Sequence, residues 1–406
     1  MLNTTRRQML HAAAAAATSS VAAALGAPAL AQAPFAWPRN FSVITPVVGT
    51  ANHSLAVAWT SKFQAATKTR VAVLPAPNGF ARANWLNTGE GRVGMLQASD
   101  YFDQMDAIQG YASEASGPHD TRVAHMNMVT PWGFVTRGDT AIKSFDDVGP
   151  GTKIALAKSS SFLVVAVNAL LAYRGLKPSD VNLVEVGSYG ANTAVLAEGR
   201  VDLSFTSPIS GPSYQAEANP AGLRWLPLPE RSKNPEAYDR YRKLMSGYVP
   251  RVTGSGVKSA IKVPMDHAYQ CNHVRADEDP AFVHQLIKWL DENHESYKND
   301  FTHAHLMTVA SLVEFLEAGA LQPMHEGTIR YLTEKGMWKP AFQARQDKLV
   351  ALARKRVDGF KAAVAAARAK GLRVDPGNAD WVKFWTDYRA KNGMATPYGE
   401  DVLALG

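Results

Sequence analysis

The 406-residue chain contains a single cysteine, Cys271, so it can form neither an intrachain disulfide nor a cluster of thiolate metal ligands. It also lacks the G-x-S-x-G, H-E-x-x-H and G-x-x-x-x-G-K-[ST] motifs of serine hydrolases, zinc proteases and P-loop nucleotide sites. His294, His303 and His305 lie close in sequence, but their spacing does not place them on one helix face. We therefore predict no catalytic residue, no cofactor and no metal site. A hydrolase or transferase is the weakest functional class, because no nucleophile–base pair can be named.

Long apolar runs are also missing. No stretch approaches about 20 apolar residues, so the sequence predicts no membrane-spanning helix. Residues 1–31 instead have the pattern of an export signal, in which Arg6 and Arg7 precede an Ala-rich stretch and an A-x-A cleavage site. The surrounding T-R-R-Q-M-L resembles the twin-arginine pattern, although paired arginines also occur in general secretory signals. We expect a periplasmic mature chain that begins near Gln32, with twin-arginine export favoured over general secretion.

An excess of basic charge is absent from most of the chain. Residues 32–340 contain 29 Lys and Arg and 29 Asp and Glu, whereas residues 341–406 contain 12 basic and 7 acidic residues. A nucleic-acid-binding protein would need a basic stripe with interleaved aromatic side chains. We therefore predict no nucleic-acid partner.

The hydrophobic pattern repeats one supersecondary plan twice. The first copy predicts strands at 41–48, 70–74 and 92–97 with helices at 54–66 and 79–88 between them. The second copy predicts strands at 153–157, 181–186 and 201–205 with helices at 162–174 and 191–198. Such alternation is typical of parallel sheets, so we expect an α/β fold of two lobes with a ligand cleft between them.

The chain should cross twice between these lobes. An apolar run at 123–136, interrupted by Pro131, predicts a strand that leaves the first lobe. A strand at 268–274, followed by helices at 280–293 and 308–318, predicts the return. Residues 230–260 are rich in Pro, Gly and charged side chains and predict an irregular segment. The predicted lobe 1 is 32–133 with 260–340, and the predicted lobe 2 is 134–259; a hinge would let them close on a ligand.

Residues 341–406 predict a helical C-terminal extension. Six apolar side chains recur at spacings of three and four residues: Leu349, Ala353, Val357, Phe360, Val364 and Ala367. Gly371 is placed to end this helix, and 379–391 predicts a shorter one. An apolar stripe is usually buried, so a cap on the first lobe is favoured over a partner-docking surface or a dimer contact.

Polar residues gather where predicted strands end and helices begin, the edge at which open α/β sheets bind ligands. The turn at 49–52 and the serines at 159–161 would each offer backbone N–H groups and a partial positive charge, which suits a carboxylate or phosphate. The predicted ligand-binding residues are Asn52, His53, Asn78, Gln97, Ser159, Ser160, Ser161, Tyr189 and Ser207. For Asn and Ser at such positions, a helix cap is the competing interpretation.

Four stretches resemble the TAXI family of TRAP-transporter solute-binding proteins. Residues 48–56 (V-G-T-A-N-H-S-L-A) resemble its T-G-S-x-G-G-T-Y-Y, and residues 83–100 (A-N-W-L-N-T-G-E-G-R-V-G-M-L-Q-A-S-D) its N-L-x-x-L-x-x-G-E-x-D-x-G-x-x-Q-x-D. Residues 196–205 (L-A-E-G-R-V-D-L-S-F) resemble its L-x-x-G-x-x-D-A-x-F. The most specific match is Q-P-M-H-E-G-T-I-R-Y-L-T-E-K-G at 322–336, which resembles P-x-H-P-G-A-x-R-Y-Y-x-E-x-G. The resemblance covers about 40–340 and excludes the extension.

This resemblance implies a type II periplasmic-binding-protein fold, ligand capture by lobe closure, and delivery to the small and large permease components of a TRAP transporter. The sequence departs from the family at Asn52-His53, where the family has two glycines, at Leu55-Ala56, where it has paired tyrosines, and at Glu326, where it has proline. The first two departures lie at the family's ligand site, so its usual ligands are not assigned to this chain.

Together these observations predict an extracytoplasmic receptor that closes over a small organic anion, a carboxylate as first choice, and passes it to TRAP membrane subunits. Arg82, Arg92, Arg122 and Arg137 are candidates to pair such an anion, although a surface position is expected for each. The alternative is a sensory or assembly module of the same fold that presents its basic extension to a protein partner. The sequence does not predict the oligomeric state.

Overall fold

The computed structural model describes residues 35–405, and the predicted export signal at 1–31 lies outside them. A compact unit begins at Pro38 and includes the rest of the described chain. Helices and strands alternate along it, and most of its strands belong to one mixed sheet. The fold is therefore α/β, as the sequence predicts. Within 35–405, none of the helices combines the length and hydrophobicity that a bilayer-spanning segment needs.

The first strand–helix unit forms where the hydrophobic pattern predicts it. It consists of β1 (Asn40–Thr45), α2 (Ala51–Thr67), β2 (Arg70–Pro75), α3 (Gly79–Thr88) and β3 (Val93–Gln97). β1 lies between β2 and β3 and is parallel to both. Leu55, Trp59 and Phe63 are one turn apart on α2 and are all buried, because this spacing turns them to the same helix face. Because α2 follows β1 and α3 follows β2, both helices begin at the carboxyl edge of the sheet.

A helix that the hydrophobic pattern does not predict follows β3 directly. All nine residues of α4 (Ala98–Asp106) are buried, including Asp100, Asp103 and Asp106. Aspartate is rarely buried unless it is paired. Three aspartates in nine residues therefore predict a surface segment rather than a buried helix. Gln97 is both the last residue of β3 and the N-cap of α4.

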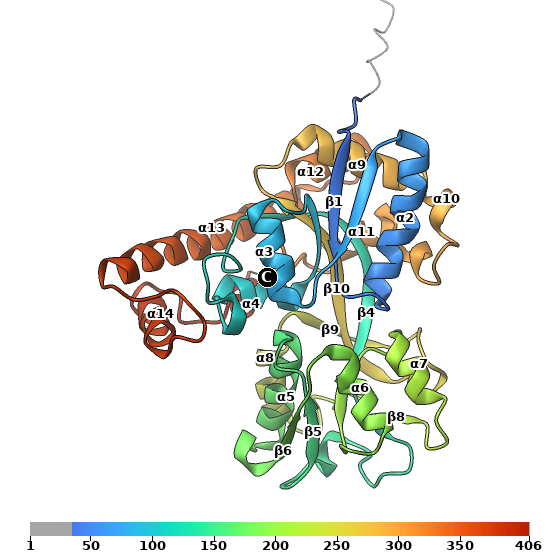
Figure 1. Ribbon diagram of the computed structural model, residues 1–406, viewed down its shortest axis with the longest axis vertical. Coiled ribbons are helices and arrows are strands. Elements are labelled where there is room, and N and C mark those ends of the chain that lie inside the picture. Colours follow the sequence, from blue (N-terminus) through green and yellow to red (C-terminus); the bar gives the residue numbers. More distant parts are fainter. Residues whose placement is uncertain (1–34, 406) are drawn as a thin grey trace, which may run out of the picture. The chain divides into compact units, whose positions relative to one another are not determined.

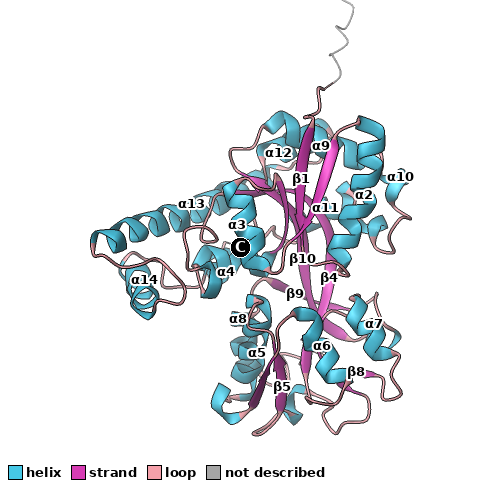
Figure 2. Cartoon of the chain, viewed as in Figure 1, coloured by secondary structure: helices cyan, strands magenta, loops and turns pink. Residues whose placement is uncertain are grey.

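Two long antiparallel strands connect the two groups of elements (Figure 1). β4 (Thr121–Arg137) and β10 (Pro264–Arg275) pair from Asp266 opposite Trp132 to Arg275 opposite Thr121. Pro131 lies inside β4 opposite His267, so the proline does not end the strand. Figure 2 shows both strands running from the upper group of helices into the lower group. The strands predicted at 123–136 and 268–274 are confirmed.

The second predicted unit forms with a different strand pairing. It comprises β5 (Lys153–Leu156), α5 (Ser161–Arg174), β6 (Asn182–Glu185), α6 (Tyr189–Ala197) and β7 (Ser204–Thr206). β5 and β6 are parallel, and Leu203, just before β7, forms a parallel bridge with Ile154 of β5, whereas β7 itself pairs antiparallel with β4. β10 is likewise antiparallel to β3. The parallel pairing predicted within each unit is confirmed for β1–β3 and for β5 with β6. It does not extend to β7, and the crossing strands make the main sheet mixed.

The prediction of an irregular segment at 230–260 is also wrong. This stretch contains α8 (Pro235–Leu244) and β9 (Tyr248–Val252), preceded by α7 (Gly211–Glu217) and β8 (Leu223–Trp225). Asn234 caps α8 by accepting a hydrogen bond from the Ala237 N–H (3.2 Å), and Pro235 occupies its first turn. Only Ala237 and Tyr241 of α8 are buried, so its apolar periodicity is too sparse to be visible in the sequence.

Four further helices pack on the first unit and on β4: α9 (Pro280–Glu292), α10 (His294–Tyr297), α11 (Val309–Glu317) and α12 (Glu326–Glu334). The helices predicted at 280–293 and 308–318 are confirmed. His325 caps α12, because its Nδ1 accepts a hydrogen bond from the Gly327 N–H (3.1 Å) and its own N–H donates to the Val123 carbonyl of β4 (2.9 Å).

We use "first lobe" for β1–β3 with α2–α4 and α9–α12, and "second lobe" for β5–β9 with α5–α8. β4 and β10 connect the two lobes and are called the crossing strands. The lobe boundaries predicted at 133/134 and 259/260 stay a prediction.

The C-terminal extension consists of α13 (Pro340–Ala369), α14 (Ala379–Lys391) and α15 (Tyr398–Leu403). The six apolar side chains of the stripe on α13 are all buried, and Gly371 follows this helix with a φ of +71°, as a C-terminal cap requires. Two indole N–H groups of α14 bind the end of α4 and the loop after it: Trp385 donates to the Asp106 carbonyl (2.9 Å) and Trp381 to the Ala112 carbonyl (2.8 Å). The extension therefore packs on the first lobe.

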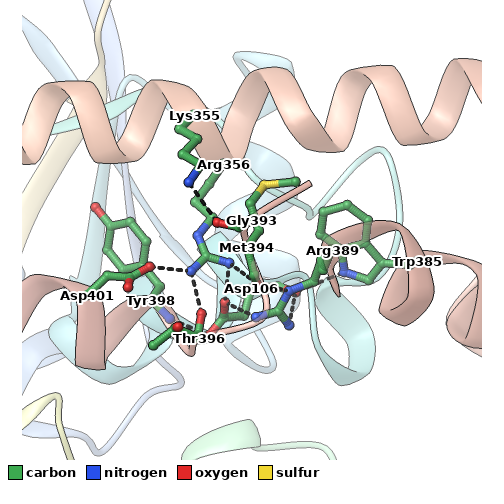
Figure 3. A network of polar contacts seen from close by, with 10 residues as sticks. All are labelled: Asp106, Lys355, Arg356, Trp385, Arg389, Gly393, Met394, Thr396, Tyr398 and Asp401. Carbon is green, nitrogen blue, oxygen red and sulfur yellow. Dashed lines mark hydrogen bonds and ion pairs between the residues drawn. The ribbon is translucent and has the colours of Figure 1, made fainter. Parts of the chain in front are cut away.

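Asp106 holds the extension through a buried charge network (Figure 3). Its Oδ1 contacts the guanidinium groups of Arg389 (2.6 Å) and Arg356 (3.1 Å), and its Oδ2 accepts from the Tyr398 N–H (2.9 Å). Arg356 is fully buried and also contacts Asp401 (2.7 Å). Burial raises the pKa of Asp106, while Arg389 and Arg356 favour its charged form. Two guanidinium groups thus depend on one buried carboxylate.

Replacing Asp106 by alanine should destabilise the protein strongly, because the buried guanidinium group of Arg356 and the partly buried one of Arg389 lose a shared partner. Breaking a buried ion pair from one side costs about 3–5 kcal/mol. The matched control is Asp387→Ala, which removes the exposed partner of Lys383 (2.7 Å) and should leave stability almost unchanged. Chemical denaturation followed by circular dichroism measures both variants, and equal midpoints would contradict the anchoring role of Asp106.

Candidate functional site

A cavity of about 90 Å³ lies between the two lobes, with walls from both lobes and from the crossing strands. Six of the nine predicted ligand-binding residues line it: Asn52, Asn78, Gln97, Ser160, Tyr189 and Ser207. The structure thus brings these strand ends and helix starts together at one place. Their role in binding a ligand stays a prediction.

The other three predicted residues lie outside the lining. His53 follows Asn52 by one residue, so α2 turns it about 100° away, and its Nδ1 lies 2.9 Å from the Thr45 hydroxyl. The Ser159 hydroxyl donates to the Gly187 carbonyl (3.5 Å). Ser161 is buried against α4, beside the Asp103 carboxyl. We leave these three residues out of the candidate site.

Six helices begin at the cavity. The N-caps of α2, α3, α4, α5 and α7 line it, as does the first residue of α6; these residues are Thr50, Asn78, Gln97, Ser160, Ser210 and Tyr189. Gln97, Ser160 and Ser210 make no side-chain cap bond, whereas Asn78 caps α3 as the competing interpretation holds. Helix starts carry free N–H groups and partial positive charge, so their convergence favours an anionic or acceptor-rich ligand.

Several buried polar atoms of the lining have no partner in the described part of the protein. They are Asn52 Oδ1, Arg82 Nε, Gln97 Nε2, Thr130 Oγ1, Trp132 Nε1 and Ser207 Oγ. A buried polar group left without a hydrogen bond costs about 1–3 kcal/mol, so six at one place indicate a ligand or ordered water. All of these atoms except Asn52 Oδ1 can donate. The site therefore suits a group rich in acceptor oxygens.

A chain of three amides orients part of this wall. Asn52 Nδ2 donates to Gln270 Oε1 (2.9 Å), and Gln270 Nε2 donates to Gln97 Oε1 (3.1 Å). Gln270 of β10 lies opposite Gln97 of β3, so the pairing of the two strands fixes this contact. The chain leaves Asn52 Oδ1 and Gln97 Nε2 free. Gln270 is not a sequence-predicted site residue, because only the strand register places it beside Gln97.

Arg82 is the only charged side chain in the described lining. It is 7% exposed and Arg122 is 6% exposed, so the expectation of a surface position is wrong for both of these arginines. Its Nη2 pairs with Asp100 Oδ2 of α4 (2.7 Å), while its Nε has no partner. Burial raises the pKa of Asp100, and Arg82 opposes this shift by favouring the carboxylate. The other candidate arginines pair outside the lining: Arg92 with Glu278, Arg122 with Asp120 and Arg137 with Asp139.

Aromatic rings form another part of the wall. Trp132 of β4, Phe162 of α5 and Tyr189 of α6 contact one another with centroid separations of 4.9, 5.7 and 6.2 Å. The Tyr189 hydroxyl is engaged, since it lies 2.9 Å from Thr206 Oγ1 and accepts from the Ser207 N–H (3.2 Å). Tyr189 therefore offers its ring to the cavity. Trp132 and Phe162 are not predicted from the sequence, because their apolar neighbours make them fit a core equally well.

The two lobes come into close contact beside the cavity. The Ser99 hydroxyl of α4 donates to Tyr248 Oη of β9 (3.3 Å), and Gly247 lies so close to Ser99 that a Cβ there would be 2.8 Å from Ser99 Cα. A side chain on Gly247 would therefore clash with the backbone of Ser99, so glycine allows the lobes to meet here. A Cβ on Gly211 would be 3.5 Å from the Gly49 carbonyl oxygen, an ordinary contact distance.

Asp103 lies in this interface without an ion pair to any described residue, and its Oδ2 has no hydrogen-bond partner. Burial raises the pKa of Asp103 well above its usual range, the nearby Ser161 hydroxyl partly offsets this, and Asp100 and Asp106 add to it. The folded state therefore favours the protonated form. Within 35–405, no group of three or more His, Cys, Asp or Glu side chains is placed to hold a metal ion.

Comparisons with known proteins identify a family. The model of the NMT1-like family matches residues 50–336. No curated protein matches the chain in sequence. The solved alkanesulfonate-binding protein SsuA from Xanthomonas axonopodis pv. citri, bound to MOPS, is 18% identical over 86% of this chain and 99% of that chain, with a TM-score of 0.39.

Two further solved structures are similar at the same level. The periplasmic aliphatic sulphonate binding protein SsuA from Escherichia coli is 16% identical over 80% of this chain and 88% of that chain, with a TM-score of 0.38. An ancestral arginine-binding protein bound to arginine is 13% identical over 65% and 96%, with a TM-score of 0.38. At these identities and scores, the similarities say nothing about the ligand of this chain.

Asp103→Asn should stabilise the protein increasingly as the pH rises above about 4. Because the pKa of Asp103 is raised in the folded state, the wild type loses stability with rising pH, by up to about 1.4 kcal/mol per pH unit, until the folded state ionises. Asparagine cannot ionise and avoids this loss. Urea denaturation of both proteins between pH 4 and 7 measures the difference.

Asp387→Asn is the control for this pH dependence. Lys383 lowers the pKa of Asp387, so this exposed carboxylate contributes with the opposite sign. A constant stability difference between Asp103→Asn and the wild type across the pH range would contradict the raised pKa of Asp103.

Proposed function

The chain belongs to the NMT1-like family, and from this membership and the cavity between the lobes we propose that it is an extracytoplasmic solute-binding receptor. It binds a small organic anion, a carboxylate as first choice, and the lobes close over it. Binding leaves the ligand chemically unchanged, since within the described lining no His, Asp, Glu, Lys or Cys side chain is available as a base or nucleophile.

The observation that carries this proposal is the set of unpartnered donors. Arg82 Nε and Gln97 Nε2 come from the first lobe and Ser207 Oγ from the segment after β7, yet all three line one cavity. A carboxylate has about four acceptor sites, so it can satisfy several of these donors at once and also meet the positive helix starts. An anion held from both lobes stabilises the closed arrangement, which is what a closing receptor requires.

The finer assignment is to the TAXI type of TRAP-transporter receptor. In this proposal the signal at 1–31 exports the chain to the periplasm, and the loaded receptor delivers its ligand to the small and large permease subunits. The four family-like stretches within 40–340 support it. The alternative of a sensory or assembly module lacks a favouring observation, because the apolar stripe of α13 is buried against the rest of the protein.

The double variant Arg82→Gln, Asp100→Asn should weaken carboxylate binding by roughly tenfold to a hundredfold, the worth of a charged hydrogen bond. Replacing both partners keeps the shape and leaves no unpaired charge, so the fold should be retained. The matched control is Arg92→Gln, Glu278→Gln, which removes an ion pair of the same length, 2.7 Å, outside the cavity.

Thermal shifts of residues 32–406 with a panel of organic acids measure this effect, because a ligand at a hundred times its Kd stabilises by about 2.7 kcal/mol. If the Arg82 variant and the control respond alike to a bound carboxylate, the ligand does not bind in this cavity. If no acid shifts the wild type, the receptor proposal itself is contradicted.

The TAXI assignment has a separate test. Proteoliposomes that contain the TRAP permease subunits encoded nearest to this chain should take up the bound carboxylate only when this protein and an inward sodium gradient are both present. Equal uptake with and without the protein would contradict the delivery role, even if the protein binds the acid.

A further inference from the structure

We propose that the ligand is a monoanion with an apolar body: a single carboxylate joined to a ring or a branched hydrocarbon, without an amino group and without a second acid. This inference rests on the proposed receptor function and names the class of its ligand. Three features of the cavity carry it, namely its charges, its aromatic wall and its size.

The charges exclude amino acids. Arg82 is the only charged group in the described lining, so a ligand ammonium group would find no carboxylate opposite it. Asp100 lies behind Arg82, is paired with it at 2.7 Å and is only 2% exposed. A desolvated ammonium group without an anionic partner is strongly unfavourable, and here it would also face the positive ends of several helices.

The charged groups of the lining also exclude dicarboxylates. Arg82 already shares its charge with Asp100 through Nη2, and its Nε has no partner and can bind one anion. Neutral donors of the same lining add hydrogen bonds to this one oxyanion; they include Gln97 Nε2 and the Ser207 hydroxyl. A second carboxylate would be buried without a cation, because the described lining contains no other Arg or Lys.

The aromatic wall of the cavity favours an apolar body in the part of the ligand that does not carry the carboxylate. The rings of three residues line the cavity, namely Trp132, Phe162 and Tyr189. The Tyr189 hydroxyl is already hydrogen-bonded to Thr206 and Ser207 and does not contact the ligand. Such a wall binds flat or branched apolar groups by burial and by ring contacts. Sugars also stack on rings, but a polyol needs acceptors for its hydroxyl protons. Among the buried, unpartnered side-chain atoms of the described lining, Asn52 Oδ1 is the only one that solely accepts.

The size of the cavity limits the ligand. The cavity volume is about 90 Å³, and a closed apolar cavity of about 150 Å³ binds one benzene molecule. A cavity of this order favours a compact acid, with a four-carbon branched chain or a phenyl ring, over a disaccharide or a long fatty acid.

Three acids with one carbon skeleton test the proposal. 3-Methylbutyrate is the apolar monoanion, valine adds an ammonium group to it, and methylsuccinate replaces one of its methyl groups by a second carboxylate. Isothermal titration of residues 32–406 should show 3-methylbutyrate binding at least about tenfold more tightly than either of the others, the equivalent of about 1.4 kcal/mol. Benzoate should bind as well, and benzamide, its neutral counterpart, much more weakly.

A substitution at Phe162 tests whether the apolar body of the ligand contacts the aromatic wall. Phe162→Ala should weaken benzoate binding roughly fivefold or more, because a ring contact is lost, with little effect on the weak binding of acetate, which has only the anionic group. Phe384→Ala removes a half-buried phenylalanine of α14, outside the cavity lining, and should leave benzoate binding unchanged.

The outcomes separate this inference from the receptor proposal. If valine or methylsuccinate binds as tightly as 3-methylbutyrate, the monoanion class is wrong and the receptor function stands. If Phe162→Ala binds benzoate as the wild type does, the aromatic wall does not hold the ligand and the inference fails. If none of these acids binds to the folded protein, both proposals fail.

Discussion

Helix α4 buries three carboxylates, Asp100, Asp103 and Asp106, at intervals of three residues, and each must be stabilised where water cannot reach it. Asp100 is paired with Arg82, and this pair sets the charge of the cavity. Asp106 binds Arg356 and Arg389 and thereby attaches the C-terminal extension. Asp103 has no cation among the described residues, and burial in the interface with the second lobe raises its pKa. The candidate site, the lobe contact and the extension therefore share one helix.

This arrangement gives the extension a structural explanation. A buried carboxylate at the end of α4 needs cations, and α13 and α14 supply Arg356 and Arg389 together with the indole N–H of Trp385. The extension is basic as a whole, but Arg356 and Arg389 serve this internal contact. The basic excess of residues 341–406 is thus partly accounted for inside the protein and does not require an external anionic partner.

The sequence predicts the elements with clear periodicity and misses those whose partners are remote. The helix at 79–88 has the predicted bounds because Asn78 caps it and Gly89 ends it, both local signals. α4 is missed because its three aspartates read as surface residues until Arg82, Arg356 and Arg389 are placed around them. Asn52 and Gln97 are found by their positions near strand ends, whereas Gln270 and the inward position of Arg82 depend on strand register and on α4, which no local pattern reveals. His53 and Ser161 are displaced from the lining by a single helical step.

The walls of the cavity divide the recognition of a ligand between the lobes. The first lobe contributes the free donors of Arg82 and Gln97, and the second lobe contributes the Ser207 hydroxyl together with the rings of Phe162 and Tyr189. A ligand shifts a two-state equilibrium only as far as it binds one state better than the other. An anion that touches the first lobe alone gains little from closure, and an apolar molecule that touches the rings alone gains equally little. Closure is therefore favoured by a molecule that joins both chemistries, so the geometry of the cavity couples specificity to the movement of the lobes.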